Sequence, residues 1–267
     1  MSKYHRHINK TMEDQLHLFS AGSMNNEKFK NLWVQGAAML IPQLNRLLDI
    51  TEAPFHIISI EEFQNDCNHL GNLFANHRSD KSTTNNYHIL YSYILNCLGG
   101  PQAKINLLEI GMGTNNPDLI SSMGWNGRPG ASLYAFRDYL PNAAIYGCDI
   151  DRAILVDSER IKTCYVDQMD TTTFDKMVKY FGESIKYDLI IDDGLHSIAA
   201  NFNTLLFALE RVADNGWIVI EDIEVYHRTN WRTIDFIMNS ESMKCRFETF
   251  RVQSRNGFLY VVHKIGE

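Results

Sequence analysis

The sequence predicts an α/β fold in which a mostly parallel sheet ends in a β-hairpin. Between residues 105 and 222, short apolar runs alternate with segments of helical periodicity, and several of these runs end in acids. This is typical of buried parallel strands that open onto a site. A glycine-rich turn follows the first run, and Asn256-Gly257 lies between the last two. These features predict five strands alternating with helices and then a hairpin, which makes a seven-stranded sheet.

Each predicted strand is a short apolar run bounded by polar residues or glycine. We expect strands at residues 105–110, 144–149, 163–166, 187–192, 217–220, 245–252 and 258–263. Apolar residues at helical spacing predict helices at 59–74, 87–98, 131–139, 197–212 and 231–237.

A helical segment precedes the strands. From Phe29 to Leu48, apolar residues recur at helical spacing, and Pro42 interrupts the pattern. No strand order is visible before residue 79. We therefore expect residues 1–78 to form a helical cap or oligomerisation region and residues 79–267 to form the main domain.

Composition and charge argue against several classes of function. The net charge of −7 argues against nucleic acid as the main partner and leaves a local basic patch open. We expect no secretory signal and no membrane association, because the first ten residues are polar and no apolar run reaches the ~18 residues of a membrane span. The five cysteines form no CxxC pair, so we expect reduced thiols and a cytoplasmic location.

Two runs that end in acids predict a metal site. Asp193 follows the run 187–192, and Glu221 and Asp222 follow the run 217–220. If these strands are parallel neighbours, their ends lie about 5 Å apart, and the carboxylates repel one another unless protons or a cation intervene. An all-oxygen cluster suits Mg²⁺, Mn²⁺ or Ca²⁺ better than Zn²⁺. His196, three residues after Asp193, is placed to act as a base beside the metal. Separate helix caps and solvated strand ends are the structural alternative.

A nucleotide-type pocket is predicted at the other strand ends. Gly111 and Gly113 follow the first strand, but Asn116 stands where the dinucleotide fingerprint has its last glycine. Asp149 ends the second strand, where an acid commonly binds ribose hydroxyls, and Ile150 is placed to pack on an adenine. Asp167 and Gln168 follow the third strand.

Four residues are candidates for substrate contact. Trp125 and Arg128 lie in a long loop between residues 114 and 130, and such loops are often functional. A surface loop with Trp125 packed back on the protein is an equal alternative. Tyr226 and His227 follow the predicted fifth strand and are placed near the metal site.

Taken together, the motifs resemble those of the metal-dependent class I S-adenosylmethionine O-methyltransferases, a Rossmann-like fold. The resemblance is strongest to macrolide-sugar enzymes and to related cephalosporin-pathway and polysaccharide-locus enzymes, and it covers about residues 79–263. It is carried by Ser79-Asp80-Lys81 with Tyr87 and Tyr91, Leu108-Glu109-Ile110-Gly111-Met112-Gly113, Gly147-Cys148-Asp149-Ile150-Asp151, Val166-Asp167-Gln168, Asp192-Asp193-Gly194-Leu195-His196 and Ile220-Glu221-Asp222.

The resemblance implies a role for each of these motifs. Metal ligands would be Asp193, Glu221 and Asp222, with Asp193 and His196 at the catalytic centre and His196 as the base. Cofactor contacts would come from Asp80, Lys81, Tyr87, Glu109, Gly111, Gly113, Asp149, Ile150, Asp167, Gln168 and Asp192.

The implied reaction is methyl transfer from S-adenosylmethionine to a hydroxyl of a sugar or sugar-nucleotide-like small molecule, with Mg²⁺ or Mn²⁺ bound, in a homo-oligomer. One alternative keeps the methyl donor and changes the acceptor to a phosphoryl-type or other small-metabolite oxygen. Two further alternatives are a NAD-type dehydrogenase or epimerase and a nucleotide-binding module without catalysis.

Overall fold

The computed structural model describes residues 43–44, 46–48, 56–63, 65–224 and 227–266. Residues 54–267 form one compact unit, to which the following description applies. Tyr226 and the predicted helical pattern from Phe29 to residue 41 lie outside the described residues. The boundary between residues 78 and 79 and the cap role of residues 1–78 remain predictions.

The compact unit contains a single mixed sheet whose strands run in the order β1-β7-β8-β6-β5-β2-β3-β4. Its strands are β1 Ile58–Ser59, β2 Asn106–Ile110, β3 Ala144–Asp149, β4 Ile161–Tyr165, β5 Tyr187–Asp192, β6 Val212–Ile220, β7 Phe247–Gln253 and β8 Phe258–Lys264. Strands β2 to β6 pair in parallel, and β7 and β8 form the antiparallel hairpin beside β6. The predicted fold class is confirmed.

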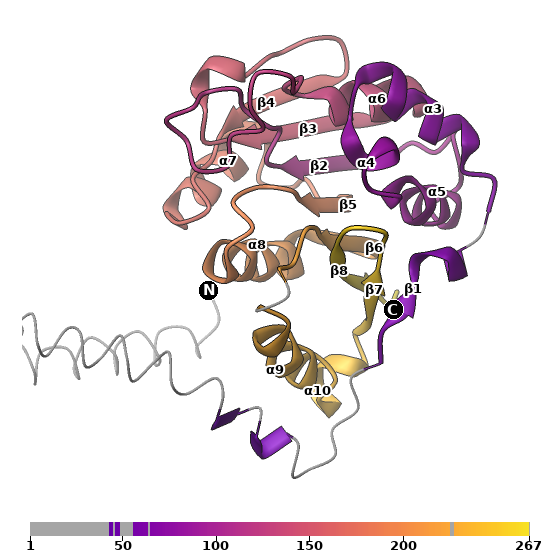
Figure 1. Cartoon of the computed structure of the whole chain (residues 1–267), viewed down its shortest axis with the longest axis vertical. Helices are drawn as coiled ribbons and strands as arrows, with labels where there is room; N and C mark the ends of the chain where they lie inside the picture. The colour runs from indigo at the N-terminus through magenta and orange to yellow at the C-terminus, as the bar shows by residue number, and fades with distance from the viewer. Residues whose placement is uncertain (1–42, 45, 49–55, 64, 225–226, 267) are drawn as a thin grey trace, which may run out of the picture. The chain divides into compact units, whose positions relative to one another are not determined.

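The helices lie between the strands along the chain (Figure 1). They are α3 Asn68–His77, α4 Asp80–Thr83, α5 Tyr87–Cys97, α6 Ala131–Tyr139, α7 Thr172–Phe181, α8 Ile198–Arg211, α9 Arg228–Met238 and α10 Glu241–Lys244. None of the helices in the described part of the chain has the length and apolar character needed to cross a bilayer.

Several details differ from the sequence prediction, among them the short helices α4 and α10, which were not predicted. The helix expected at residues 59–74 begins only at Asn68, because Ile58–Ser59 pairs with β7 as an eighth strand and Ile60–Phe63 forms a 3₁₀ turn. Ile60 and Phe63 are both buried by that turn, which explains the helical spacing in the sequence. Strand β6 begins at Val212 rather than at residue 217, with a register shift against β5.

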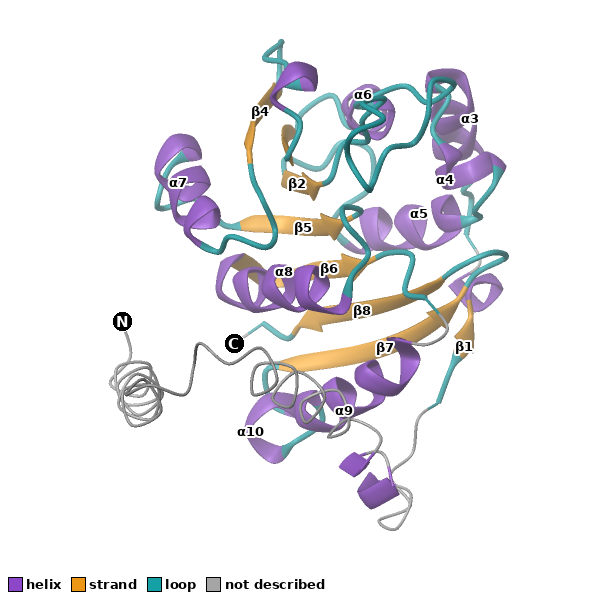
Figure 2. Cartoon of the chain, turned by 60° about the vertical axis from the view of Figure 1, so that its left-hand side comes forward, coloured by secondary structure: helices purple, strands orange, loops and turns teal. Residues whose placement is uncertain are grey.

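Side chains alternate between two apolar clusters, one on each face of the sheet. Helices α3, α5 and α6 cover one face, where the strands contribute Leu107, Leu189, Ile191, Trp217 and Val219. Helices α7, α8 and α9 pack on the other face, where the strands contribute Leu108, Ile110, Ile190, Ile218 and Ile220. Figure 2 shows α8 lying along the sheet beside β5 and β6.

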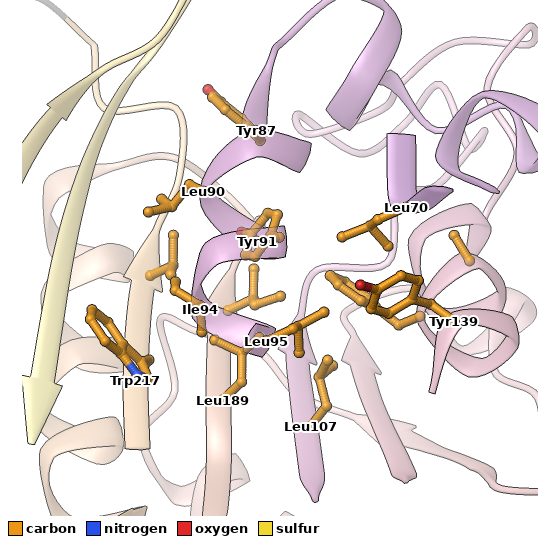
Figure 3. Packing of buried hydrophobic residues seen from close by; sticks show 14 of the residues in the cluster. Leu70, Tyr87, Leu90, Tyr91, Ile94, Leu95, Leu107, Tyr139, Leu189 and Trp217 are labelled. Atoms are coloured by element: carbon orange, nitrogen blue, oxygen red, sulfur yellow. The ribbon is translucent and has the colours of Figure 1, made fainter. Parts of the chain in front are cut away.

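Helix α5 is central to the first face. Tyr91, Ile94 and Leu95 point from it toward Leu107 and Leu189 (Figure 3). All five side chains are fully buried. This packing fixes the helix over the strands whose carboxyl ends carry the predicted site.

Candidate active site

Three acids lie on the same face of three adjacent strands. In β2, β5 and β6, side chains alternate between the two faces, because the side-chain period of a strand is two. Glu109 therefore lies on the same face as Leu107, which is the face that α5 covers. In the same way, Asp193 lies on the face of Ile191, and Glu221 lies on the face of Val219. The order β6-β5-β2 makes the three strands neighbours. The predicted pairing of β5 with β6 is confirmed, with Asp192 opposite Ile220.

The ammonium of Lys81 lies among these three acids. Its Nζ is 2.7 Å from Asp193 Oδ2, 2.6 Å from Glu221 Oε2 and 3.4 Å from Glu109 Oε1. Only 1% of the Lys81 side chain is exposed. It reaches the acids from the first turn of α4, where Ser79 caps the helix by accepting the Lys81 N–H.

This arrangement changes the pKa values of the buried groups. Burial opposes the charge on Lys81, but the carboxylates of Asp193, Glu221 and Glu109 hold the pKa of Lys81 well above its ordinary value. Burial raises the pKa of Glu109 to about 7, although the Lys81 ammonium opposes the rise. Burial also raises the pKa of Glu221, again against the effect of Lys81. The ammonium therefore stays charged and compensates part of a buried acidic cluster.

Two tyrosines of α5 hold the acid pair that follows β6. Tyr87 OH donates a hydrogen bond to Asp222 Oδ1, and Tyr91 OH donates one to Glu221 Oε1. The tyrosines are four residues apart and therefore share one side of the helix. Burial raises the pKa of both phenols, so both remain protonated donors near neutral pH.

Asp193, His196 and Asp222 could together hold a metal ion, since one ligand atom from each lies within 4.8 Å of the others. His196 Nε2 is 3.8 Å from Asp193 Oδ1 and 4.0 Å from Asp222 Oδ2. Glu221, which the sequence also placed among the ligands, uses its two oxygens to accept hydrogen bonds from Lys81 and Tyr91. Its coordination of a metal remains a prediction.

His196 and Asp222 both have left-handed backbones, with φ of 55° and 51°. This conformation is uncommon for residues other than glycine, and it clusters at functional sites, where the surrounding structure supports the strain. The capped start of α8, where Ser197 accepts the Ala200 N–H, follows His196 directly. The local folds at both strand ends therefore turn these two side chains toward one point.

A pocket of about 320 Å³ opens at the ends of β2 to β5. Its walls include Gly111, Asp149, Ile150, Asp167 and Gln168, as predicted, together with Asp118 to Ser121 from the long loop. Sequence reasoning missed the loop residues, although the unusual length of the loop was a signal.

Several predicted cofactor contacts have partners inside the protein. Asp149 Oδ2 accepts a hydrogen bond from Met112 N, and Gln168 Nε2 donates to Asp192 Oδ1 and Thr204 Oγ1. Asp192 is completely buried on the α8 face, where Asn201 also donates to it. Gln168 and Asp192 thus tie the ends of β4 and β5 to α8. Their contact with a cofactor remains a prediction.

A wider pocket of about 690 Å³ adjoins the first one, and Ile120, Ser121 and Gly194 line both. Its other walls include the predicted residues Asp80, Lys81, Gly113, Arg128, Asp193, His196 and Asp222. Trp125 is 94% exposed, so it is not packed back on the protein, and it lies outside the residues that line this pocket. His227 is the residue before α9, and the next residue, Arg228, lines a third pocket with His196 and Asp222.

Two curated relatives match part of the sequence, and no protein-family model matches it. Mycinamicin VI 2''-O-methyltransferase of Micromonospora griseorubida is 35% identical over 122 residues, which are 45% of this chain and 27% of that protein. The 8-demethyl-8-(2-methoxy-alpha-L-rhamnosyl)-tetracenomycin-C 3'-O-methyltransferase of Streptomyces olivaceus is 30% identical over 156 residues, which are 58% of this chain and 36% of that protein. The matches thus span about a quarter to a third of the relatives' length.

Solved structures show the same fold. MycE methyltransferase from the mycinamycin biosynthetic pathway, in complex with Mg and SAH, superposes with a TM-score of 0.56 at 21% identity over 74% of this chain and 55% of that chain. Its complex with Mg, SAH and mycinamycin VI gives a TM-score of 0.56 at 20% identity, over 74% of this chain and 54% of that chain. The chain therefore has the Rossmann-like fold of the class I methyltransferases and shares sequence with two proteins that are named as O-methyltransferases.

Proposed function

We propose that the chain transfers a methyl group from S-adenosylmethionine to a hydroxyl oxygen of a sugar or sugar-containing metabolite, with a divalent metal bound at the site. One observation carries the proposal. The pocket at the ends of β2 to β5 shares a wall at Gly194 with the pocket that contains Asp193, His196 and Asp222. A methyl donor in the first pocket would therefore adjoin an acceptor in the second.

The first pocket suits an adenosyl group. Apolar side chains of Ile110, Val166 and Leu195 line it beside the carboxylates of Asp149 and Asp167. Ile150, 38% exposed at its edge, offers a surface for a flat base. Asp149 ends β3, the strand position at which an acid commonly binds ribose.

The group formed by Asp193, His196 and Asp222 suits Mg²⁺ or Mn²⁺. It offers two carboxylates on partly exposed side chains, with the imidazole of His196 beside them. Carboxylate oxygens suit both Mg²⁺ and Mn²⁺. When bound, the metal would lower the pKa of a nearby hydroxyl and S-adenosylmethionine would supply an electrophilic methyl group.

His196 is the base in this proposal. A sugar hydroxyl has a pKa far above neutral, so transfer is helped by a group that accepts its proton. His196 lines both the wide pocket and the third pocket, and its side chain is 32% exposed. Asp193 and Asp222 face its Nε2 and stabilise the imidazolium that forms.

The relatives support a sugar acceptor. Both curated relatives are named as O-methyltransferases of glycosylated natural products. Mycinamycin VI is present in a complex of MycE. In this chain the wide pocket carries polar and charged side chains, among them Asp80, Arg128 and Asn126, which can bind sugar hydroxyls. A homo-oligomer remains a prediction.

The proposal predicts methyl transfer that needs a divalent metal. The protein is incubated with S-adenosylmethionine and a panel of monosaccharides, nucleotide sugars and glycosides, and formation of S-adenosylhomocysteine is measured. Activity toward at least one sugar should disappear in EDTA and return when Mg²⁺ or Mn²⁺ is added in excess. Undiminished activity in EDTA would remove the metal from the proposal.

A further inference from the structure

Asp193 and Asp222 each divide their two carboxylate oxygens between an internal partner and the open site. Asp193 Oδ2 accepts a hydrogen bond from Lys81 Nζ at 2.7 Å, and Asp222 Oδ1 accepts one from Tyr87 OH. The other oxygen of each acid, Asp193 Oδ1 or Asp222 Oδ2, lies within 4.0 Å of His196 Nε2. The protein thus binds one oxygen of each acid and leaves the other facing the predicted metal position.

Lys81 directs its ammonium to the acids. Nζ donates hydrogen bonds to Asp193 Oδ2 at 2.7 Å and Glu221 Oε2 at 2.6 Å, and it forms an ion pair with Glu109 Oε1 at 3.4 Å. With only 1% of the side chain exposed, a cofactor would meet little of it. A direct cofactor contact, which the sequence motif suggested, is therefore a poorer account of Lys81 than an internal role.

The acidic cluster needs a positively charged side chain when no metal ion is bound. Glu109 and Glu221 are almost completely buried, and Asp193 and Asp222 are partly buried beside them. Carboxylates at such distances repel one another, and a buried charge without a partner is strongly destabilising. Within the described part of the chain, Lys81 is the lysine or arginine with ion pairs to these acids.

We propose that Lys81, together with Tyr87, is a positioning group that neutralises and orients this cluster before a divalent cation binds. The inference rests on the metal-dependent function proposed above. Lys81 acts as the internal counter-ion, and Tyr87 fixes the direction of the Asp222 carboxylate. Both come from the segment before β2, so the metal site is built by α4 and α5 as well as by the two strand ends.

The first experiment replaces Lys81 by methionine, which keeps an unbranched side chain and removes the charge. In EDTA, the Lys81→Met variant should melt about 6–20 °C below wild type, as expected for breaking a buried ion pair in a domain of this size. Mn²⁺ should then raise its melting temperature more than that of wild type, because the metal supplies the missing positive charge. Lys179→Met, at an exposed lysine of α7, is the control and should melt like wild type under both conditions.

The second experiment replaces Tyr87 by phenylalanine, which keeps the buried ring and removes the hydroxyl. Groups that orient metal ligands typically contribute about 10- to 100-fold to metal affinity. The Tyr87→Phe variant should therefore bind Mn²⁺ about 10- to 100-fold more weakly, measured by the EPR signal of free Mn²⁺. Because Tyr87 donates its hydroxyl hydrogen bond to Asp222 and lines neither the first nor the wide pocket, the variant's affinity for S-adenosylhomocysteine in EDTA should stay unchanged. A loss of that affinity would make Tyr87 the cofactor contact that the sequence motif suggested. Tyr180→Phe, at an exposed tyrosine, is the matched control.

The outcomes separate this inference from the proposed function. If wild type binds no Mn²⁺, both the metal-dependent function and the positioning role are wrong. If wild type binds Mn²⁺ but Lys81→Met melts normally in EDTA, or is not preferentially stabilised by Mn²⁺, only the positioning role is wrong. Loss of S-adenosylhomocysteine binding by a folded Lys81→Met with a normal Mn²⁺ response would make Lys81 a cofactor contact. If Lys81→Met does not fold, Tyr87→Phe decides: wild-type Mn²⁺ affinity in that variant overturns the inference.

Discussion

At the scale of single residues, the site depends on which oxygen each acid presents. Asp193 and Asp222 each keep one oxygen near His196 Nε2, and the left-handed backbones of His196 and Asp222 direct these side chains to one place. Sequence spacing predicted that Asp193, His196 and Asp222 would gather. It did not reveal how Glu221 is used, because the positions of the Lys81 ammonium and the Tyr91 hydroxyl depend on tertiary packing.

The His196→Gln variant tests the role of the imidazole. If His196 is the base, turnover should fall about 10²- to 10⁴-fold, while Mn²⁺ and S-adenosylhomocysteine affinities stay close to wild type. His69→Gln, at an exposed histidine of α3, should keep wild-type turnover. Loss of Mn²⁺ binding in His196→Gln would instead make the imidazole a metal ligand, as its place near Asp193 and Asp222 also allows.

At the scale of elements, the ends of β2 and β5 pass very close to each other. Gly111 has φ of 89°, and a Cβ built there would lie 2.1 Å from the carbonyl oxygen of Asp193. The family resemblance implied that this glycine contacts the cofactor. It does line the first pocket, but the closest neighbour of the absent side chain is the backbone that carries Asp193.

Comparing Gly111→Ala with Gly124→Ala isolates this contact. Gly124 also has a positive φ, of 70°, but a Cβ there would meet nothing within 4 Å. In Gly124→Ala, the free energy of unfolding should fall by about 1–2 kcal/mol, which is the conformational cost of a left-handed residue that has a Cβ. In Gly111→Ala it should fall by a further ~1–3 kcal/mol, because the two strand ends must also separate. Urea unfolding of both variants measures the difference, and equal losses would show that the close approach is unimportant.

Strands β2 to β8 were predictable where a short apolar run has a clear end, as in β5 and in the β8 run before His263. Element boundaries were less predictable. Ile60 and Phe63 repeat at helical spacing, yet the segment is a strand followed by a 3₁₀ turn, because pairing with β7 overrides local preference. The short helix α4 carries no apolar pattern of its own, so its place over the acids could not be derived from sequence.

At the scale of the whole compact unit, the strand order places the two halves of the predicted reaction side by side. The sequence predicted a donor pocket at β2 to β4 and a metal site at β5 and β6, and the order β6-β5-β2-β3-β4 makes these regions adjacent. The loop of residues 118–121 contributes to both pockets, which sequence reasoning could not place because loops lack a periodic pattern. The acceptor is equally beyond sequence reasoning, since the shape of the wide pocket depends on that loop.

The most direct test of the central claim measures whether the metal and the methyl donor bind as neighbours. S-adenosylmethionine labelled with ¹³C at its methyl carbon is bound to the Mn²⁺-loaded protein, and paramagnetic relaxation of the methyl resonance is recorded. We predict strong relaxation enhancement in wild type and its loss in the Asp193→Asn/Asp222→Asn double variant. Unchanged methyl relaxation in wild-type protein, with both Mn²⁺ and the donor shown to be bound, would contradict the account.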